Sequence, residues 1–498
     1  MEQKQRKTIA KYSGIKMKDY FFYAIGDFGT CLVFGCANSL LQTYYSDCLG
    51  FNPIYILVIY LVARIWDAVN DIIMGRICDR IRPGKSGKFK RYLLWMCMPF
   101  AVASVLMFAL NANSVDAIVA SMGSMWPAYV LAGFTYILFG MCMTAIQIPY
   151  SSLASVVTLD ASERGKLSIW RGVLGQLGGI PALAVKAYAF FPPTDPDHKP
   201  VEWEPLIIGV GILAVFTVLL LLVCYFGTKE RYTAKQVKHD KGSMKRALSR
   251  IAHSRSMLSI CVISAIVAGA GMFTTAYSGY VVRIYFEMSG WRQTLPDFSF
   301  IAAIFIMMIA TPWMSKKFGK KETTVFGLGI STTVYIVMVF LRYAGASESV
   351  YWIYVALNFI SGLGTSFFSM LMWGMVADAV DDMEVKHGVR EDGTSLSLML
   401  FFRKVGQCLS FVAVNLSLIA MGRYVVSNWS PSPDQLILCW NLGAYIPLIC
   451  YAVGMLLFIF WFPINKRRLE EIQDEKEELL ASIEKEKQDA LKKLGLAK

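Results

Sequence analysis

The sequence predicts an all-α membrane protein with twelve transmembrane helices in two halves of six, followed by a charged helix. Of the 498 residues, 55% are hydrophobic and only 17% are charged, whereas a soluble domain carries about 25% charged residues. The apolar residues form segments of about 20 residues, which is the length that crosses a bilayer as a helix. The basic residues fall in short runs between alternate segments, as expected when Lys and Arg stay on the cytoplasmic side.

The apolar segments number twelve, six on each side of a polar and basic stretch. We expect spans at residues 20–45, 52–75, 92–112, 127–158, 168–191, 205–227, 256–286, 297–315, 323–344, 350–378, 395–421 and 437–463. The predicted organisation is an N-terminal segment 1–19, a six-helix bundle 20–227, a central loop 228–255, a second six-helix bundle 256–463 and a tail 464–498. A short basic turn follows the second span of each half, and such internal repeats are common in secondary transporters.

The loops predict the orientation of the chain in the membrane. The loops 76–91, 228–255 and 316–321 are basic, whereas 46–51 and 345–349 carry neither Lys nor Arg. The positive-inside rule therefore places both termini and the central loop in the cytoplasm. The basic N-terminal segment lacks the apolar core of a cleavable signal peptide.

Composition argues against several other classes of protein. A net charge of +13 would suit a nucleic-acid partner, but the positive charge is spread between spans, so we expect none. The eleven cysteines are scattered without a C-x-x-C pair, and no His cluster accompanies them. The sequence therefore predicts no zinc site, no disulfide framework and no cofactor. Without a nucleophile–base pattern, we do not expect an enzyme.

The second span carries the strongest functional signal. Arg64, Asp67 and Asp71 are ionisable groups within a predicted membrane helix, where each charge costs at least about 2.5–3.5 kcal/mol. Asp67, Asn70 and Asp71 share one helical face because they are spaced i, i+3, i+4. Two carboxylates in a low-dielectric site need a partner, which would be a bound cation, a proton or Arg64. The alternative is a structural charge network with Arg64.

Three further spans contribute polar groups. Thr144 and Gln147 share a face of the fourth span, where Thr144 can complete an oxygen cage and Gln147 can bond a polyol; helix packing is an equal alternative. Asp27 in the first span and Lys404 in the eleventh give one charged residue from each half, which suits a substrate site at the repeat interface. Arg403 beside Lys404 either snorkels to the interface or pairs structurally.

Acidic clusters follow the fourth and tenth spans. Acids at a helix C-terminus oppose its dipole, so we expect basic residues of nearby cytoplasmic loops to hold them; a solvated loop is the alternative. The predicted cytoplasmic gating residues are Asp160, Arg164, Asp378, Asp381, Glu384 and Arg390. The tail from 466 to 498 is dense in Glu and Lys with an incomplete apolar stripe. We expect a solvated amphipathic helix, with a coiled coil or a cytoplasmic regulator of the tail as alternatives.

Several motifs resemble one known family, the glycoside–pentoside–hexuronide:cation symporters, whose best-known members are the melibiose carriers. The resemblance covers residues from about 20 to 422 and rests on the motifs at 44–50, 64–75 with 87–90, 144–149, 158–164, 376–384 and 388–404. It implies the major facilitator fold, a bacterial cytoplasmic membrane and symport coupled to Na⁺, Li⁺ or H⁺. In the family, the residues matching Asp67, Asn70, Asp71 and Thr144 bind the coupling cation.

The substrate site departs from the melibiose pattern. A Lys-Asp pair used there for sugar is Thr30-Cys31 here, and the fourth-span acid is Gln147. Because Arg171 and Lys404 are kept, the resemblance implies a more positive pocket, and therefore either an anionic sugar such as a glucuronide or a different neutral glycoside. Asp27 restores one acid a turn away from Cys31. The predicted substrate-site residues are Asp27, Thr30, Cys31, Tyr44, Arg64, Gln147, Tyr150, Arg171, Trp373 and Lys404.

The predicted function is therefore cation-coupled uptake of a sugar, glycoside or hexuronide by alternating access. The expected partners are the sugar, a monovalent cation and the lipid bilayer. Two alternatives stay open: an uncoupled facilitator, and a transporter-like sugar sensor that signals through the tail.

Overall fold

The computed structural model describes residues 16–80, 87–158, 161–191, 199–231, 254–387, 392–422, 431–472 and 474–475. Nearly all of them are helical, and among them one isolated β-bridge joins Phe190 to Val201. The helices before the central loop are α2 (Met17–Ser39), α3 (Leu41–Thr43), η1 (Tyr44–Cys48), α4 (Pro53–Arg80), α5 (Lys90–Leu106), α6 (Ala112–Met122), α7 (Trp126–Val157), α8 (Ala161–Gly178), α9 (Ile180–Ala189) and α10 (Trp203–Gly227). Those after it are α12 (Arg255–Tyr280), η2 (Val281–Tyr285), α13 (Trp291–Phe318), α14 (Lys320–Leu341), η3 (Arg342–Ala344), α15 (Glu348–His387), α16 (Asp392–Ala420) and α17 (Pro433–Phe460).

The fifth predicted span, 168–191, is two helices instead of one. α8 ends at Gly178 and α9 begins at Ile180. Pro181 lies in the first turn of α9, where its missing N–H is tolerated, whereas inside a continuous helix it would break a hydrogen bond. The loop 111–126 also contains an unpredicted short helix, α6, which is capped by Asn111.

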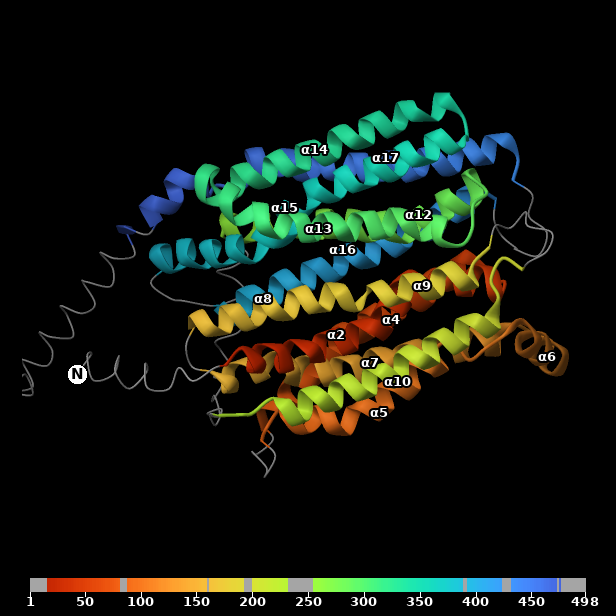
Figure 1. Cartoon of the computed structure of the whole chain (residues 1–498), viewed down its shortest axis with the longest axis horizontal. Helices are drawn as coiled ribbons and strands as arrows, with labels where there is room; N and C mark the ends of the chain where they lie inside the picture. The colour runs from red at the N-terminus through yellow and green to blue at the C-terminus, as the bar shows by residue number, and fades with distance from the viewer. Residues whose placement is uncertain are drawn as a thin grey trace, which may run out of the picture. The chain divides into compact units, whose positions relative to one another are not determined.

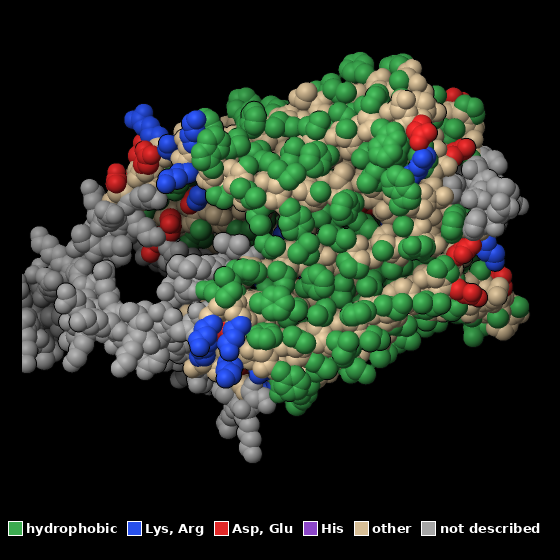
Figure 2. All heavy atoms as spheres, viewed as in Figure 1, with side chains coloured by type: hydrophobic (Ala, Val, Ile, Leu, Met, Phe, Trp, Pro, Cys, Tyr) green, Lys and Arg blue, Asp and Glu red, His purple; other side chains and the backbone are tan. Residues whose placement is uncertain are grey.

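The exposed surface of the long helices is apolar. Nine helices among the described residues are long and apolar enough to cross a membrane. On α10, for example, Ile208, Ile212, Val215 and Leu219 are exposed, which suits contact with lipid tails instead of water. Figure 2 shows hydrophobic side chains along the lengths of the helices, and charged side chains gathered near their ends. The chain is therefore a multi-pass membrane protein.

Contacts divide the structure into two compact units. The first comprises Met1–Lys238, Thr275–Phe298 and Phe411–Cys439, and the second comprises His239–Thr274, Ser299–Ser410 and Trp440–Lys498. Within the first unit, α7 packs against α4 and α5, and α2 packs against α8 and α10 (Figure 1). Within the second, α14 packs against α15. The predicted division into halves 20–227 and 256–463 stays a prediction.

Two buried ion pairs explain why residues 275–298 belong to the first unit. Arg283 in η2 donates to Asp47 in η1 at 2.9 Å, with side chains only 2% and 0% exposed. Lys186 in α9 donates to Asp297 in α13 at 2.7 Å, with side chains 3% and 2% exposed. Ser278 also donates to Asp297. A buried charge is tolerated only when it is paired, so these pairs fix which segments can pack together.

The start of the central loop is also fixed within the first unit. The carboxylate of Glu230 accepts hydrogen bonds from the backbone N–H groups of Lys88, Phe89 and Lys90, at 2.7–2.8 Å. These groups lie at the N-terminus of α5, where a negative charge is favourable. The motif after the second span, whose basic residues predict the orientation of the chain, therefore also caps a helix.

Removing one member of a buried ion pair should destabilise the protein more than removing both. We expect Lys186→Met to cost about 3–5 kcal/mol, because it leaves Asp297 as a buried charge without its cation. Lys186→Met/Asp297→Leu should recover most of that loss. Thermal unfolding of the purified protein in detergent measures both; equal destabilisation of the single and double variants would contradict the pairing argument.

Candidate functional site

A polar stripe on α7 organises the candidate site. Gly140, Thr144, Gln147 and Ser151 are spaced by four, three and four residues, so they lie on one helical face. The first two residues face acids of α4, and the last two contact α2 and α8. One helix therefore carries both the predicted cation ligand, Thr144, and a predicted substrate ligand, Gln147.

The cation half of the site lies between α4 and α7. Thr144 Oγ1 donates to Asp71 Oδ1 at 3.1 Å. Asp67 Oδ1 lies 2.6 Å from the position that a Cβ on Gly140 would occupy, so the carboxylate rests directly against the α7 backbone. Asn70 is buried, and no described residue accepts a hydrogen bond from its Nδ2. The structure thus places a hydroxyl of α7 against one carboxylate of α4 and the α7 backbone against another, and oxygen ligands of these kinds are those that hard cations prefer.

Arg64 lies at the edge of this group. Its NH1 is 3.8 Å from Asp67 Oδ2, and its guanidinium carbon lies 5.6 Å from the ring centroid of Phe411. Arg64 therefore neighbours the predicted cation ligands, as the sequence suggested. Its predicted role toward the substrate stays a prediction.

The substrate half of the site is a hydrogen-bonded network centred on Gln147. Gln147 Nε2 donates to Asp27 Oδ1 at 3.2 Å and to Thr30 Oγ1 at 3.1 Å, and its Oε1 accepts from Arg171 NH2 at 2.8 Å. Arg171 NH1 donates to Ser151 Oγ at 2.9 Å, and its Nε lies 3.4 Å from Asp27 Oδ1. Side chains from α2, α7 and α8 thus meet in one network.

Two stacked tyrosines support this network. The rings of Tyr23 and Tyr150 stack at 4.9 Å, and Tyr150 Oη donates to the carbonyl of Tyr23. The Arg171 guanidinium lies 4.8 Å from the ring centroid of Tyr150, a favourable cation–π distance. Tyr150 therefore orients Arg171 in this conformation; any direct contact with substrate stays a prediction.

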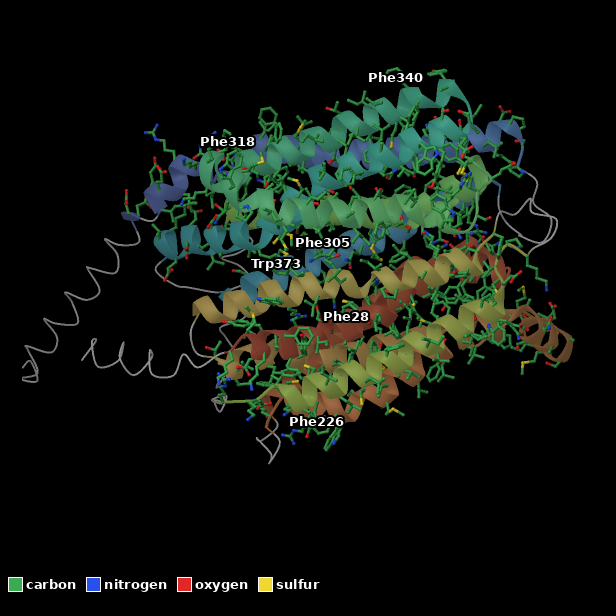
Figure 3. All side chains as sticks on the ribbon, viewed as in Figure 1. Phe28, Phe226, Phe305, Phe318, Phe340 and Trp373 are labelled. Atoms are coloured by element: carbon green, nitrogen blue, oxygen red, sulfur yellow. The ribbon has the colours of Figure 1, made fainter. Side chains whose placement is uncertain are left out.

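The other predicted substrate residues are placed differently. Tyr44 is completely buried, and its hydroxyl donates to the carbonyl of Leu110 at 2.6 Å, so it is engaged within the fold. Cys31 is half-buried one turn after Asp27 on α2. Lys404 on α16 and Trp373 on α15 belong to the second unit, and Trp373, which is labelled in Figure 3, is exposed.

The predicted gating acids are partly paired as expected. Lys320 Nζ bonds both carboxylate oxygens of Asp378 at 2.7 Å. Asp381 and Glu384 lie half-buried on the last turns of α15. Asp160 and Arg390 lie outside the described residues, as does the side chain of Arg164. Their gating role stays a prediction.

The start of the tail docks on the second unit. Asp382 accepts from Ser256 at 2.5 Å and from Lys386 at 2.7 Å, and Arg468 NH2 lies 3.7 Å from it. Hydrogen bonds to Glu475 and then Glu471 raise the pKa of Arg468 above its usual range. A cavity of about 250 Å³ lies beside this cluster. The first turns of the tail thus contact the second unit through the Arg468–Asp382 ion pair, and the expectation of a solvated amphipathic helix stays a prediction.

Comparison with known proteins identifies the family. A family model described as MFS/sugar transport protein matches residues 22–466. The chain belongs to the sugar-transport family of the major facilitator superfamily. The transporter is 27% identical to the isoprimeverose transporter of Lactiplantibacillus pentosus, over 92% of this chain and 91% of that protein. It is 26% identical to the glycoside/cation symporter YagG of Escherichia coli (strain K12), over 92% and 94%.

A solved structure shows the same fold. The transporter superposes on a mutant form of the nucleoside transporter NupG with a TM-score of 0.63, covering 88% of this chain and 99% of that chain at 11% identity. The expected membership of the glycoside–pentoside–hexuronide:cation symporters is confirmed. These relatives are transporters and not enzymes, as the sequence predicted.

Sequence reasoning missed the residues that allow close approach between helices. Gly140 lies four residues before Thr144, and Gly175 lies four residues after Arg171. A Cβ at Gly175 would lie 2.7 Å from Asp27 Oδ2. Spacing from a known polar residue could have suggested both glycines, because each lies one turn along the same face.

A methyl group at Gly140 should disturb the cation half of the site. Gly140→Ala forces the Asp67 carboxylate away from α7, so we expect the concentration of coupling cation needed for half-maximal transport to rise by about tenfold or more. Gly133→Ala is the matched control, because its added Cβ would meet only Ile59 at 3.7 Å, an ordinary contact distance. Uptake measured against cation concentration tests the pair, and an equal response of both variants would contradict the assignment.

Proposed function

We propose that the transporter is a twelve-span symporter that couples uptake of a sugar or glycoside to a monovalent cation. The observation that carries this proposal is the stripe on α7, whose Thr144 bonds an α4 acid while its Gln147 bonds the α2–α8 network. The names of the relatives, an isoprimeverose transporter and a glycoside/cation symporter, support it.

The twelve spans are the nine apolar helices together with α4, α5 and the α8–α9 pair. α4 contains Arg64, Asp67 and Asp71, α5 has 17 residues, and the fifth span is divided at Gly179. These three segments are therefore not among the nine apolar helices for three different reasons: α4 carries charges, α5 is short, and the fifth span is broken. With the basic loops inside, both termini lie in the cytoplasm, and a bacterial cytoplasmic membrane is the proposed location.

The coupling cation binds at Asp67, Asn70, Asp71 and Thr144. Na⁺ and Li⁺ prefer oxygen ligands, and all four residues supply oxygens from facing helices. Protonation of one of the two acids is the alternative form of the same coupling. A cation bound to Asp71 would replace the hydrogen bond that Thr144 donates to this carboxylate. The change in Thr144 would reach Gln147 through α7, because the two residues lie one turn apart.

Binding of cation and sugar should therefore be reciprocal. If the cation orders the α7 stripe, then sugar affinity rises with cation, and cation affinity rises with sugar by the same factor. Alternating access, with the acids at the end of α15 as a cytoplasmic gating network, completes the proposed cycle. Docking of a cytoplasmic regulator on the tail stays a prediction.

An anionic sugar is a second candidate substrate. Arg171 favours it, because a guanidinium is the side chain best suited to bind a carboxylate. A neutral glycoside is the first candidate, since polyol hydroxyls can bond the donors and acceptors of Gln147, Asp27 and Thr30.

Loss of Asp71 should abolish coupling. In proteoliposomes, a sudden rise in external Na⁺, or in Li⁺ or H⁺, should accelerate uptake of the transported glycoside by wild type. Asp71→Cys should show no such acceleration, while Asp116→Asn, an exposed change on α6, should behave as wild type.

Two outcomes would contradict the proposal. Cation-stimulated uptake by Asp71→Cys would place the cation elsewhere, and cation-independent uptake by wild type would indicate an uncoupled facilitator. A chain truncated after Asn465 tests the sensor alternative, because a symporter should still exchange sugar in counterflow.

A further inference from the structure

Asp27 and Arg171 form an ion pair inside the candidate substrate site. Asp27 belongs to α2 and Arg171 to α8, and their side chains are only 13% and 25% exposed. We propose that Asp27 is the specificity-determining residue that makes this transporter prefer uncharged sugars, because it neutralises Arg171 and repels anionic ones. This inference rests on the proposed sugar site of the preceding subsection.

Each of the three guanidinium nitrogens of Arg171 already has a partner. Its Nε faces Asp27, its NH1 donates to Ser151, its NH2 donates to Gln147, and its flat face lies over Tyr150. A substrate carboxylate needs two parallel N–H groups of one guanidinium for a strong bidentate contact. Such a contact would therefore compete with Asp27, Gln147 and Ser151 for the same guanidinium.

Asp27 is held in place from two sides. Its Oδ1 accepts from Gln147 Nε2 at 3.2 Å. Its Oδ2 points to α8 at Gly175, where a Cβ would lie 2.7 Å away. The absence of a side chain at Gly175 therefore lets the carboxylate reach α8 next to Arg171. No hydrogen bond among the described residues uses Oδ2, so this oxygen can accept one from a sugar hydroxyl.

The pair sets the charge that a ligand meets. The negative charge of Asp27 offsets the positive charge of Arg171, so the pair has little net charge. A neutral ligand rich in hydroxyl groups can hydrogen-bond both to the carboxylate and to the N–H groups of the guanidinium. An anionic ligand instead meets a carboxylate in a partly buried site, where like charges repel more strongly than in water. Such repulsion is a common way in which a site rejects the wrong ligand.

Cys31 offers a second position for the same charge. It lies four residues after Asp27 on the same face of α2, and its Sγ is 3.6 Å from the Cβ position of Gly175. A carboxylate at position 31 would therefore face the same part of α8. This geometry supplies a rescue variant that does not depend on Asp27.

The experiment measures binding of matched probes to the purified full-length transporter by isothermal titration calorimetry in the presence of Na⁺. The probes are the 4-nitrophenyl β-glycosides of glucose, galactose and xylose, and the corresponding glucuronide and galacturonide. Glucoside and glucuronide differ only in the carboxylate at C6. Wild type should bind at least one uncharged probe more tightly than any uronide.

The variants should shift the ratio of the two dissociation constants. Asp27→Asn should lower the ratio of the uronide dissociation constant to the neutral-probe dissociation constant by about tenfold or more. This is the scale of a lost charged interaction. Asp27→Asn/Cys31→Asp and Asp27→Asn/Arg171→Gln should both restore the preference for neutral probes. Cys31→Asp alone should weaken uronide binding further, so the test holds even if Asp27→Asn does not fold.

Three results would overturn the inference: tighter binding of a uronide by wild type, an unchanged ratio in folded Asp27→Asn or Cys31→Asp, or no binding of any uncharged probe. Failure of the proposed symport looks different. If wild type prefers neutral probes but its affinity for them does not change with Na⁺, Li⁺ or pH, coupling is refuted and the role of Asp27 still holds.

Discussion

The polar stripe of α7 is the feature on which the rest of the candidate site depends. A polar side chain within a membrane bundle is most stable when it is hydrogen-bonded, and Thr144, Gln147 and Ser151 have their partners on neighbouring helices. Thr144 finds Asp71 on α4, whereas Gln147 and Ser151 find Asp27 and Arg171 on α2 and α8. Satisfying one stripe thus positions three other helices. It also gives a physical link between a cation and a sugar, because both ligands would act on adjacent turns of one rigid helix.

Charge pairing extends the same constraint beyond the site. The pairs Arg283–Asp47 and Lys186–Asp297 are almost completely buried, and each joins segments from different predicted halves within the first unit. Asp27 and Arg171 form an ion pair within the predicted first half, and theirs is partly exposed. The almost completely buried pairs join segments of the fold, whereas Asp27 and Arg171 keep the partial exposure that the proposed contact with a ligand requires.

The sequence predicts the local features well and the long-range ones poorly. The face shared by Asp67, Asn70 and Asp71 follows from helical spacing, and apolar length predicts the helices. Spacing could not show that Asp27 meets Arg171, or that Lys186 meets Asp297 over 111 residues, because these pairings depend on which helices are neighbours. Gly140 and Gly175 have no side chain to signal a contact, so their spacing from Thr144 and Arg171 is the only sequence feature that points to them. Pro181 is apparent in the sequence, but a proline alone does not predict where a helix ends, and the break at Gly179 emerges only in the structure.

The most direct test of the cation site is the affinity of the purified transporter for its sugar with and without the coupling cation, in wild type and in Thr144→Val. Valine has nearly the shape of threonine but removes the oxygen that bonds Asp71. If the α7 stripe links the two ligands, Na⁺, Li⁺ or protons will tighten sugar binding by wild type severalfold or more, and Thr144→Val will lose that gain while keeping its cation-free affinity. An equal gain in both proteins would contradict the account.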